Sequence, residues 1–218
     1  MGLLRNIFGP SKEEIWVQLE QEINAQFILK KSFLVDDSKV VLEHKNWTIV
    51  LDVFHRSTGK STIPYTRMRC AYVNKDDFRF EIFKEGFFAT IGKYFGMEDI
   101  EIEDKIFDDT FVLKSKNPEK IKTLFKDEDI KNDFLALSSL SQFQVKVKDD
   151  EGYFGQHFPE GVDELYLEVV GVLKDLEKLK IMFKLFSEIM DRLCEIGSAY
   201  ETRPEIDLQQ QSIFIKSK

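Results

Sequence analysis

Residues 47–85, WTIVLDVFHRSTGKSTIPYTRMRCAYVNKDDFRFEIFKE, decide the fold because their alternating pattern predicts three antiparallel strands. From Trp47 to Val53, apolar residues alternate with residues of mixed polarity, as in a strand with one buried face. A three-residue loop at 74–76, or a longer loop with the same register, pairs the second strand with the third and collects apolar side chains on one face. These are Met68, Cys70, Tyr72, Phe78, Phe80 and Ile82.

The opposite face of the same two strands carries charged residues. The predicted pairing places Arg69 directly across from Glu81, on the face that also holds Arg67 and Arg79. Arginine binds carboxylate and phosphate groups through paired hydrogen bonds, and a sheet holds its side chains more rigidly than a loop. These four residues are therefore the candidate ligand-binding residues. The alternative is a cross-strand charge ladder, Arg69 with Glu81 and Asp52 with a neighbouring arginine.

Start signals on either side of these strands predict further elements. Pro10, Ser11 and Glu14 include the spacing of a capping box, so a helix begins there and carries an apolar face as far as Phe27. Asn117 followed by a proline predicts another helix start. Further strands are predicted at 40–42, 110–114, 143–148 and 164–170, and further helices at 87–95, 118–125 and 127–137.

The last long element, residues 173–196, has apolar residues at alternating steps of three and four. Its apolar stripe is broad, which is typical of a helix packed on a sheet and not of the narrow seam of a coiled coil. A homodimer through this helix, or through the tail at 200–218, is the alternative. The tail is polar except for residues 213–215, so it is either disordered or adds a strand to a sheet edge.

The order of these elements gives the fold class α+β. The predicted fold is a largely antiparallel sheet, with a meander at about 38–85 and later strands, packed by an N-terminal helix and a long C-terminal helix. Few glycines and prolines are available for a linker, so residues 11–199 are predicted to form a single domain. Residues 1–10 form an N-terminal segment and residues 200–218 a C-terminal tail.

Composition limits the partners and the location. The chain has 31 basic and 39 acidic residues, a net charge of -8 and a pI of about 5.1, which opposes binding to nucleic acid. Cys70 and Cys194 lack the spacing of a redox or zinc site and fit buried thiols in a reducing compartment. No apolar run reaches the roughly 18 residues of a transmembrane helix, and the N-terminus does not read as a signal peptide. We therefore expect a cytoplasmic protein.

The N-terminal segment has a small apolar group at helical spacing. Its members are Leu3, Leu4, Ile7 and Phe8. Such a segment either touches a membrane surface peripherally or docks on its own domain.

Side chains that bind metals or catalyse reactions are few. His44 and His55 are near in sequence, but a hairpin turn between them places their rings at opposite ends of a ladder, and His157 fits a surface loop. The acidic stretch from Glu98 to Asp109 is a weak candidate for a divalent cation, because it lacks the spacing and central glycine of an EF-hand loop. No Gly-rich phosphate loop, GxSxG elbow, HExxH helix or paired CxxC motif is present. The sequence identifies no catalytic residue, metal ligand or cofactor.

Between Trp47 and Phe125 several segments resemble an uncharacterised bacterial protein family of unknown function. They are NWTIVLD, TRMR, DFRFEIFKEG and GMEDIEIEDKIFDDTFVLKSKNP. The motifs in them are structural: a strand, a capped turn and a helix. The resemblance implies a bacterial origin but no activity, cofactor or catalytic residue.

Three modes of action follow from the sequence. The first is a non-catalytic binding or protein-interaction module that uses a sheet face, an edge strand or the tail. The second is a binding protein for a small anionic molecule or lipid that uses the arginine-bearing face. The third is a divalent-metal-dependent enzyme with its acidic site at 98–109. The lack of a catalytic motif beside strong packing signals favours the first.

Overall fold

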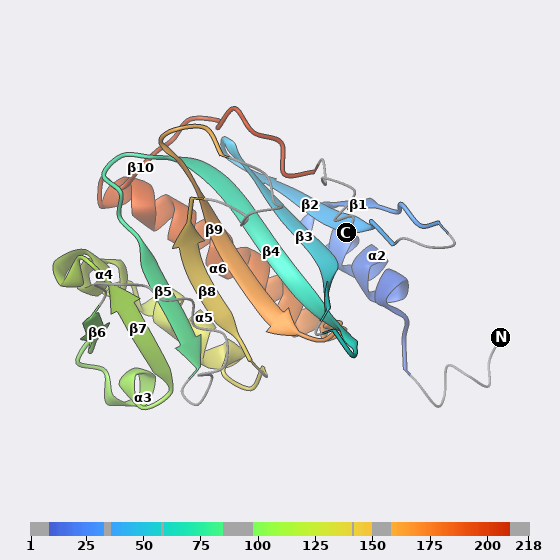
Figure 1. Cartoon of the computed structure of the whole chain (residues 1–218), viewed down its shortest axis with the longest axis horizontal. Coiled ribbons are helices and arrows are strands. Elements are labelled where there is room, and N and C mark those ends of the chain that lie inside the picture. The colour runs from blue at the N-terminus through green and yellow to red at the C-terminus, as the bar shows by residue number, and fades with distance from the viewer. Residues whose placement is uncertain are drawn as a thin grey trace.

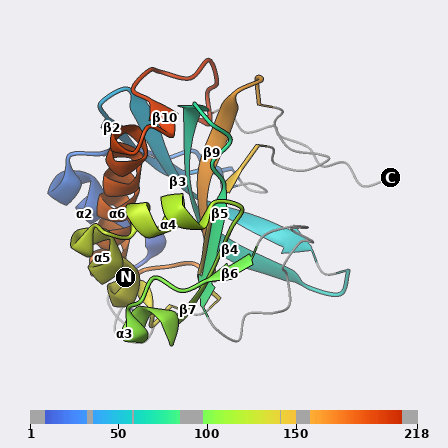
Figure 2. The same ribbon diagram turned by 90° about the vertical axis from the view of Figure 1, so that its left-hand side faces the viewer.

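The computed structural model describes residues 9–32, 36–57, 59–84, 98–140, 142–149 and 158–209. Within these residues ten strands form one sheet, and neighbouring strands in it are antiparallel. Figures 1 and 2 show α2, α5 and α6 together on one face of the sheet. The described part of the chain is therefore an α+β fold with an antiparallel sheet, as the sequence predicts.

The elements have the following bounds. The helices are α2 (Lys12–Ile23), α3 (Lys105–Asp108), α4 (Pro118–Leu124), α5 (Glu128–Leu137) and α6 (Leu176–Glu195). The strands are β1 (Gln26–Ile28), β2 (Lys39–His44), β3 (Trp47–Ser57), β4 (Thr62–Asn74), β5 (Phe80–Lys84), β6 (Glu98–Ile100), β7 (Phe111–Ser115), β8 (Gln144–Lys148), β9 (Val162–Val170) and β10 (Ala199–Tyr200). Their order in the sheet is β1, β2, β3, β4, β9, β8, β5, β7, β6, and β10 pairs with the end of β4.

The strands β2, β3 and β4 form a meander, but β5 does not continue it. The strand β4 pairs with β3 and β9, whereas β5 pairs with β7 and β8. The predicted hairpin through residues 74–76 is therefore wrong, and Arg69 is not directly across from Glu81. The predicted apolar face is nevertheless correct, because alternation fixes the face of a strand without fixing its neighbour. All six of its side chains are buried: Met68, Cys70, Tyr72, Phe78, Phe80 and Ile82.

The main core lies between the helices and the sheet. Trp16 of α2 and Trp47 of β3 are fully buried in it. Beside α5, five phenylalanine rings lie with centroids 4.9–6.1 Å apart, at the separations of favourable aromatic pairs. The long helix α6 packs on the sheet as predicted, while a homodimer through it stays a prediction. Its buried side chains are Leu179, Met182, Phe183, Leu185, Phe186, Ile189, Met190 and Leu193.

Local capping signals form the contacts that the sequence predicts. The Ser11 hydroxyl accepts the Glu14 N–H at 3.1 Å, and the Glu14 carboxylate accepts the Ser11 N–H at 2.9 Å. Both groups start α2 by satisfying backbone donors that the helix leaves free. At the start of α4, the Asn117 side chain accepts the Lys120 N–H at 3.1 Å.

The edge strand β1 has a side chain bound along its open side. The Glu20 carboxylate of α2 accepts the backbone N–H of Phe27 at 2.8 Å. One backbone donor of this edge is thereby already satisfied.

Several predictions fall outside the described residues. They concern Leu3, Leu4, Ile7 and Phe8, the helix at 87–95, His157 and the apolar residues 213–215. Of the helices that the structure describes, none has both the length and the apolar character needed to cross a membrane.

Candidate functional site

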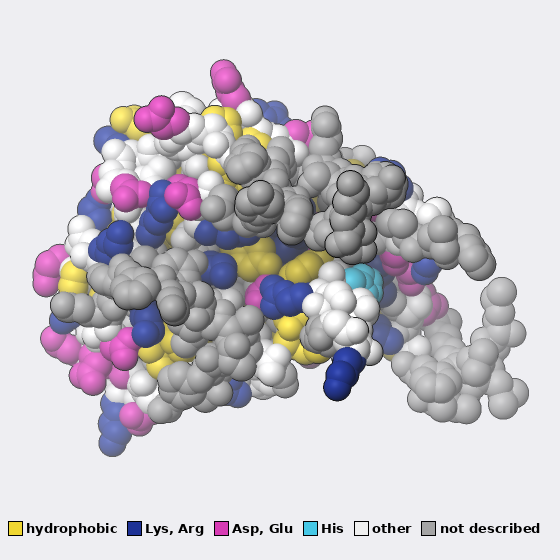
Figure 3. Space-filling view, in the orientation of Figure 1, with side chains coloured by type: hydrophobic (Ala, Val, Ile, Leu, Met, Phe, Trp, Pro, Cys, Tyr) yellow, Lys and Arg dark blue, Asp and Glu magenta, His cyan; other side chains and the backbone are white. Residues whose placement is uncertain are grey.

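The face of the sheet turned away from the helices carries a network of charged side chains. Figure 3 looks onto this face and shows Lys and Arg side chains gathered around apolar ones over its middle. Backbone register places Arg67 between Asp52 and Glu168 on the neighbouring strands. We name this surface the helix-free face and define it by Lys39, Glu43, Asp52, Arg56, Arg67, Arg69, Glu81, Asp99, Lys114, Gln144, Lys146, Lys148, Glu164, Tyr166 and Glu168.

Asp52 of β3 holds two of the candidate arginines. Arg67 donates from Nε and Nη2 to its two carboxylate oxygens, each at 2.8 Å. Arg69 donates from Nη2 to Oδ2, also at 2.8 Å. Asp52 and Arg69 are almost completely buried, so these contacts are shielded from water. The predicted ladder between Asp52 and a neighbouring arginine is therefore present.

Tyr166 of β9 stands at the centre of a second group. Its hydroxyl donates to the Glu168 carboxylate at 2.7 Å, and Arg56 donates to the same carboxylate at 2.9 Å. The Lys148 ammonium lies 4.0 Å from the centre of the Tyr166 ring and 3.0 Å from Glu164. Burial and the nearby Glu168 carboxylate raise the pKa of Tyr166, so the phenol stays a hydrogen-bond donor.

Lys146 and Glu81 are cross-strand neighbours in the middle of the face. Lys146 Nζ lies 5.5 Å from the centre of the Tyr166 ring and forms no ion pair with another described residue. Burial lowers the pKa of Lys146, and the neighbouring Glu81 partly offsets this. Glu81 is fully buried; Gln144 donates to its Oε1, whereas its Oε2 has no hydrogen-bond partner among the described residues. Burial raises the pKa of Glu81.

The structure brings together only part of the predicted ligand-binding set. Arg67 and Arg69 share Asp52, and Glu81 lies further along the row of Arg69, beyond β9 and β8. Arg79 contacts a different group of carboxylates. Its guanidinium lies 2.8 Å from Asp77, 2.8 Å from Asp149 and 3.4 Å from Asp163.

His44 and His55 lie apart, as predicted. The His44 Nε2 lies 2.9 Å from Asp191 Oδ1, and His55 pairs with Pro64 near the far end of β3. Of the acidic stretch, Asp104 accepts two backbone N–H groups at the start of α3, and Asp99 pairs with Lys114. Among the residues that the structure places, no three His, Cys, Asp or Glu side chains are arranged to hold a metal ion.

Sequence reasoning did not single out Lys146, Tyr166 or Glu168. A signal for them exists, because residues 143–148 alternate apolar side chains with Gln144, Lys146 and Lys148. Residues 164–168 alternate in the same way. The pairing of β8 with β9, which joins the two alternating patterns, is a long-range feature that neither strand reveals alone.

Comparison with protein-family models, with curated proteins and with solved structures finds no match to this chain. The resemblance of residues 47–125 to an uncharacterised bacterial family therefore stays a prediction.

Proposed function

We propose that the chain is a non-catalytic binding module that receives an acidic segment of a partner protein on its helix-free face. The proposal rests on the charge of this face, where seven cations stand against six carboxylates of the strands although the whole chain has a net charge of -8. Complementary charge steers encounters and penalises wrong partners. The cations are Lys39, Arg56, Arg67, Arg69, Lys114, Lys146 and Lys148, and the carboxylates are Glu43, Asp52, Glu81, Asp99, Glu164 and Glu168.

Lys146 is the proposed contact point for a partner carboxylate. Its ammonium has no carboxylate partner among the described residues, so a ligand gains a charge-assisted hydrogen bond without breaking an internal ion pair. The Tyr166 ring beside it adds apolar contact area. Arg67 and Arg69 already bind Asp52, so their role in the proposal is to hold the face together.

A reducing bacterial cytoplasm is the proposed setting. Cys70 is buried, Cys194 is half-buried, and both are free thiols. Free thiols of this kind are usual in reducing compartments. The bacterial origin rests on the resemblance of residues 47–125 alone.

Fluorescence anisotropy with a labelled hexaglutamate peptide tests the proposed function. We expect binding to the wild type that weakens as salt is added, because salt screens exposed charges. Lys146→Gln should weaken binding about tenfold, which corresponds to about 1.4 kcal/mol.

The matched control is Lys180→Gln. It removes the same charge from α6, where Lys180 pairs with Glu22 and Glu177 on the helix side of the molecule. We expect this variant to bind the peptide like the wild type. No binding at millimolar peptide, or equal weakening by both substitutions, contradicts the proposal.

A small anionic ligand at Lys146 is the second candidate function. The observation in its favour is the same ammonium without a carboxylate partner among the described residues, beside the Tyr166 ring. Pyrophosphate is a suitable probe, and it should raise the thermal unfolding temperature of the wild type but not of Lys146→Gln. An equal shift in both proteins counts against this candidate.

A further inference from the structure

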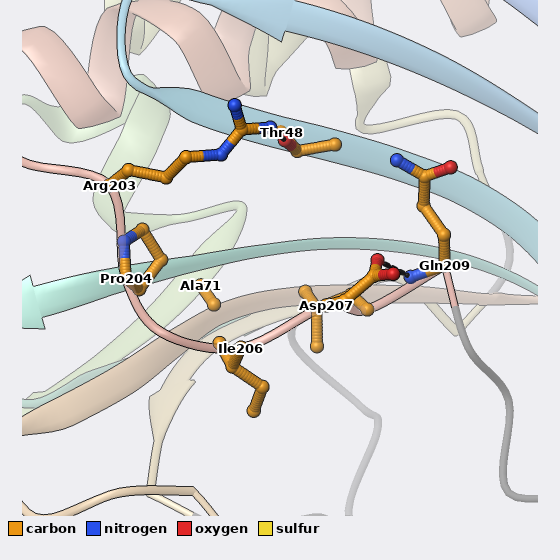
Figure 4. Close-up of a pocket in the computed structure, with 8 residues that line it drawn as sticks. Thr48, Ala71, Arg203, Pro204, Ile206, Asp207 and Gln209 are labelled. Carbon is orange, nitrogen blue, oxygen red and sulfur yellow. Dashed lines mark hydrogen bonds between the residues drawn. The ribbon is translucent and has the colours of Figure 1, made fainter.

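Residues 201–209, ETRPEIDLQ, cross the helix-free face after the short strand β10, and we name them the strap. Figure 4 shows the strap passing over the strands, with Arg203 directed toward Thr48. Arg203 lies 3.3 Å from the Thr48 hydroxyl and 3.4 Å from Glu43. At the other end, Arg69 donates to the Leu208 carbonyl at 3.2 Å and Lys39 donates to the Gln209 carbonyl at 2.5 Å. The strap is thus bound at two ends.

Side chains of the strap rest on a small apolar area of this face. Leu208 is buried and Ile206 is half-buried against it. The area is formed by Val50, Ala71 and Val162. Between its two ends the strap leaves a cavity of about 280 Å³, lined by Thr48, Ala71 and strap residues. The strap is therefore not in continuous contact with the face between its two ends.

The strap also matches the face in charge. It carries Glu201, Glu205 and Asp207 against a single arginine. Residues 205–208 read Glu-Ile-Asp-Leu, an alternation of acidic and apolar side chains. The cations of the face, Arg69 and Lys39, bind its main-chain carbonyls, which any peptide can supply.

We propose that the strap occupies a docking site for a partner segment with the same alternation of acidic and apolar residues, and that partner and strap compete for it. This inference rests on the proposed function, since it takes the acidic partner as given. It adds the sequence pattern of the partner segment and the place on the helix-free face where that segment binds. Main-chain acceptors supply general affinity, and the apolar area at Val50 and Ala71 selects a side chain like that of Leu208. With an intramolecular occupant, the apparent affinity of a competing ligand equals its intrinsic affinity multiplied by the fraction of molecules in which the site is uncovered.

A labelled peptide with the sequence ETRPEIDLQ tests the competition in the full chain. The variant Leu208→Asp places a carboxylate on the apolar area and should release the strap. We expect the peptide to bind this variant at least about tenfold more tightly than the wild type. A scrambled peptide with its two apolar residues adjacent should not show this difference. Ile106→Asp is the matched control, because Ile106 is 69% exposed and lies in α3 beside β7, at the other side of the sheet from the strap's contacts on β2 and β3, and it should bind like the wild type.

Equal affinity of the peptide for the wild type and Leu208→Asp overturns the inference, as does binding to neither. If near-ultraviolet circular dichroism shows that Leu208→Asp does not fold, Leu208→Ala takes its place. The expected increase in peptide affinity is then smaller. The two proposals fail differently. If the proposed function is wrong, hexaglutamate does not bind, or its binding is unchanged by Lys146→Gln. If only this inference is wrong, the ETRPEIDLQ peptide binds the wild type and Leu208→Asp equally.

Discussion

Among single residues, Asp52 has the largest predicted effect on the helix-free face because its carboxylate binds both Arg67 and Arg69. Asp52→Asn keeps the size of the side chain but removes the buried negative charge that the two guanidinium groups share. Removing one partner of a buried ion pair costs about 3–5 kcal/mol. Urea unfolding should therefore show a loss of this size.

Asp99→Asn is the control for this substitution. Asp99 pairs with Lys114 at 3.1 Å, but its side chain is 73% exposed, so the pair is screened by water. Exposed pairs contribute less than about 1 kcal/mol. Similar losses in the two variants contradict the assignment of a buried charge network around Asp52.

The buried carboxyl of Glu81 gives a prediction about pH. Burial raises its pKa above the ordinary value of 4.5, which Glu81 regains in the unfolded chain. Between the ordinary and the raised pKa the folded protein holds the extra proton, so this group reduces stability as pH rises through that window. Glu81→Gln should raise the urea midpoint at pH 7, and this advantage should disappear as pH falls to about 4.5.

The exposed residue Glu160 supplies the control for the pH experiment. Glu160→Gln should leave the urea midpoint close to that of the wild type at both pH values. A lower midpoint for Glu81→Gln at pH 7 shows that the charged form of Glu81 stabilises the fold, which is opposite to the prediction.

At the scale of elements, the capping box of α2 makes a measurable contribution. Ser11→Ala removes the hydroxyl that accepts the Glu14 N–H, and the loss of such a cap costs about 1 kcal/mol. Ser187→Ala is a matched control inside α6, where the hydroxyl only bonds back to the Phe183 carbonyl. Alanine is the better helix former there, so that variant should be neutral or slightly more stable. Chemical denaturation measures the unfolding free energy of both variants. An equal loss in both contradicts a specific stabilising role of the cap.

The elements show how far the sequence alone predicts this fold. Alternation and capping signals predict the start of α2, the helices α4 and α6 and the buried face of β4 correctly, because they are set by neighbours within a few residues. The predicted end of the first helix is wrong: its apolar pattern continues to Phe27, but α2 ends at Ile23 with Asn24 in a left-handed conformation, and Phe27 lies in β1. The predicted position of β5 is wrong for a physical reason. A hairpin with β4 and the actual position between β8 and β7 bury the same side chains, so the alternating pattern does not distinguish them. The candidate site is predicted only in part for the same reason. Arg67 and Arg69 were found from their own strand, whereas Lys146 and Tyr166 become their neighbours only through the pairing of β4, β9 and β8.

For the whole molecule, the insertion of β9 between β4 and β8 joins distant parts of the chain. Thr66 of β4 pairs with Val169 of β9, so the sheet cannot close until residues far apart in sequence meet. Folding slows as such long-range pairs dominate, and comparable β-rich domains fold in about milliseconds to seconds. Stopped-flow refolding, followed by the fluorescence of buried Trp16 and Trp47, should therefore show a phase no faster than about a millisecond.

Prolyl isomerisation also gives slow phases, and double-jump refolding after brief unfolding separates the two causes. The phase assigned to the sheet should persist when all prolyl bonds are still native. Complete recovery of fluorescence within a sub-millisecond dead time contradicts the prediction.

The contact between Glu20 and the Phe27 N–H has a consequence for aggregation. Open edge strands offer backbone donors and acceptors on which further chains can assemble into fibrils. At β1, a carboxylate from α2 already occupies one of these donors and places a negative charge beside the edge. At the opposite edge, β6 is only three residues long and carries the exposed carboxylate of Asp99. Both ends of the sheet thus carry features that discourage the strand-by-strand growth from which fibrils form.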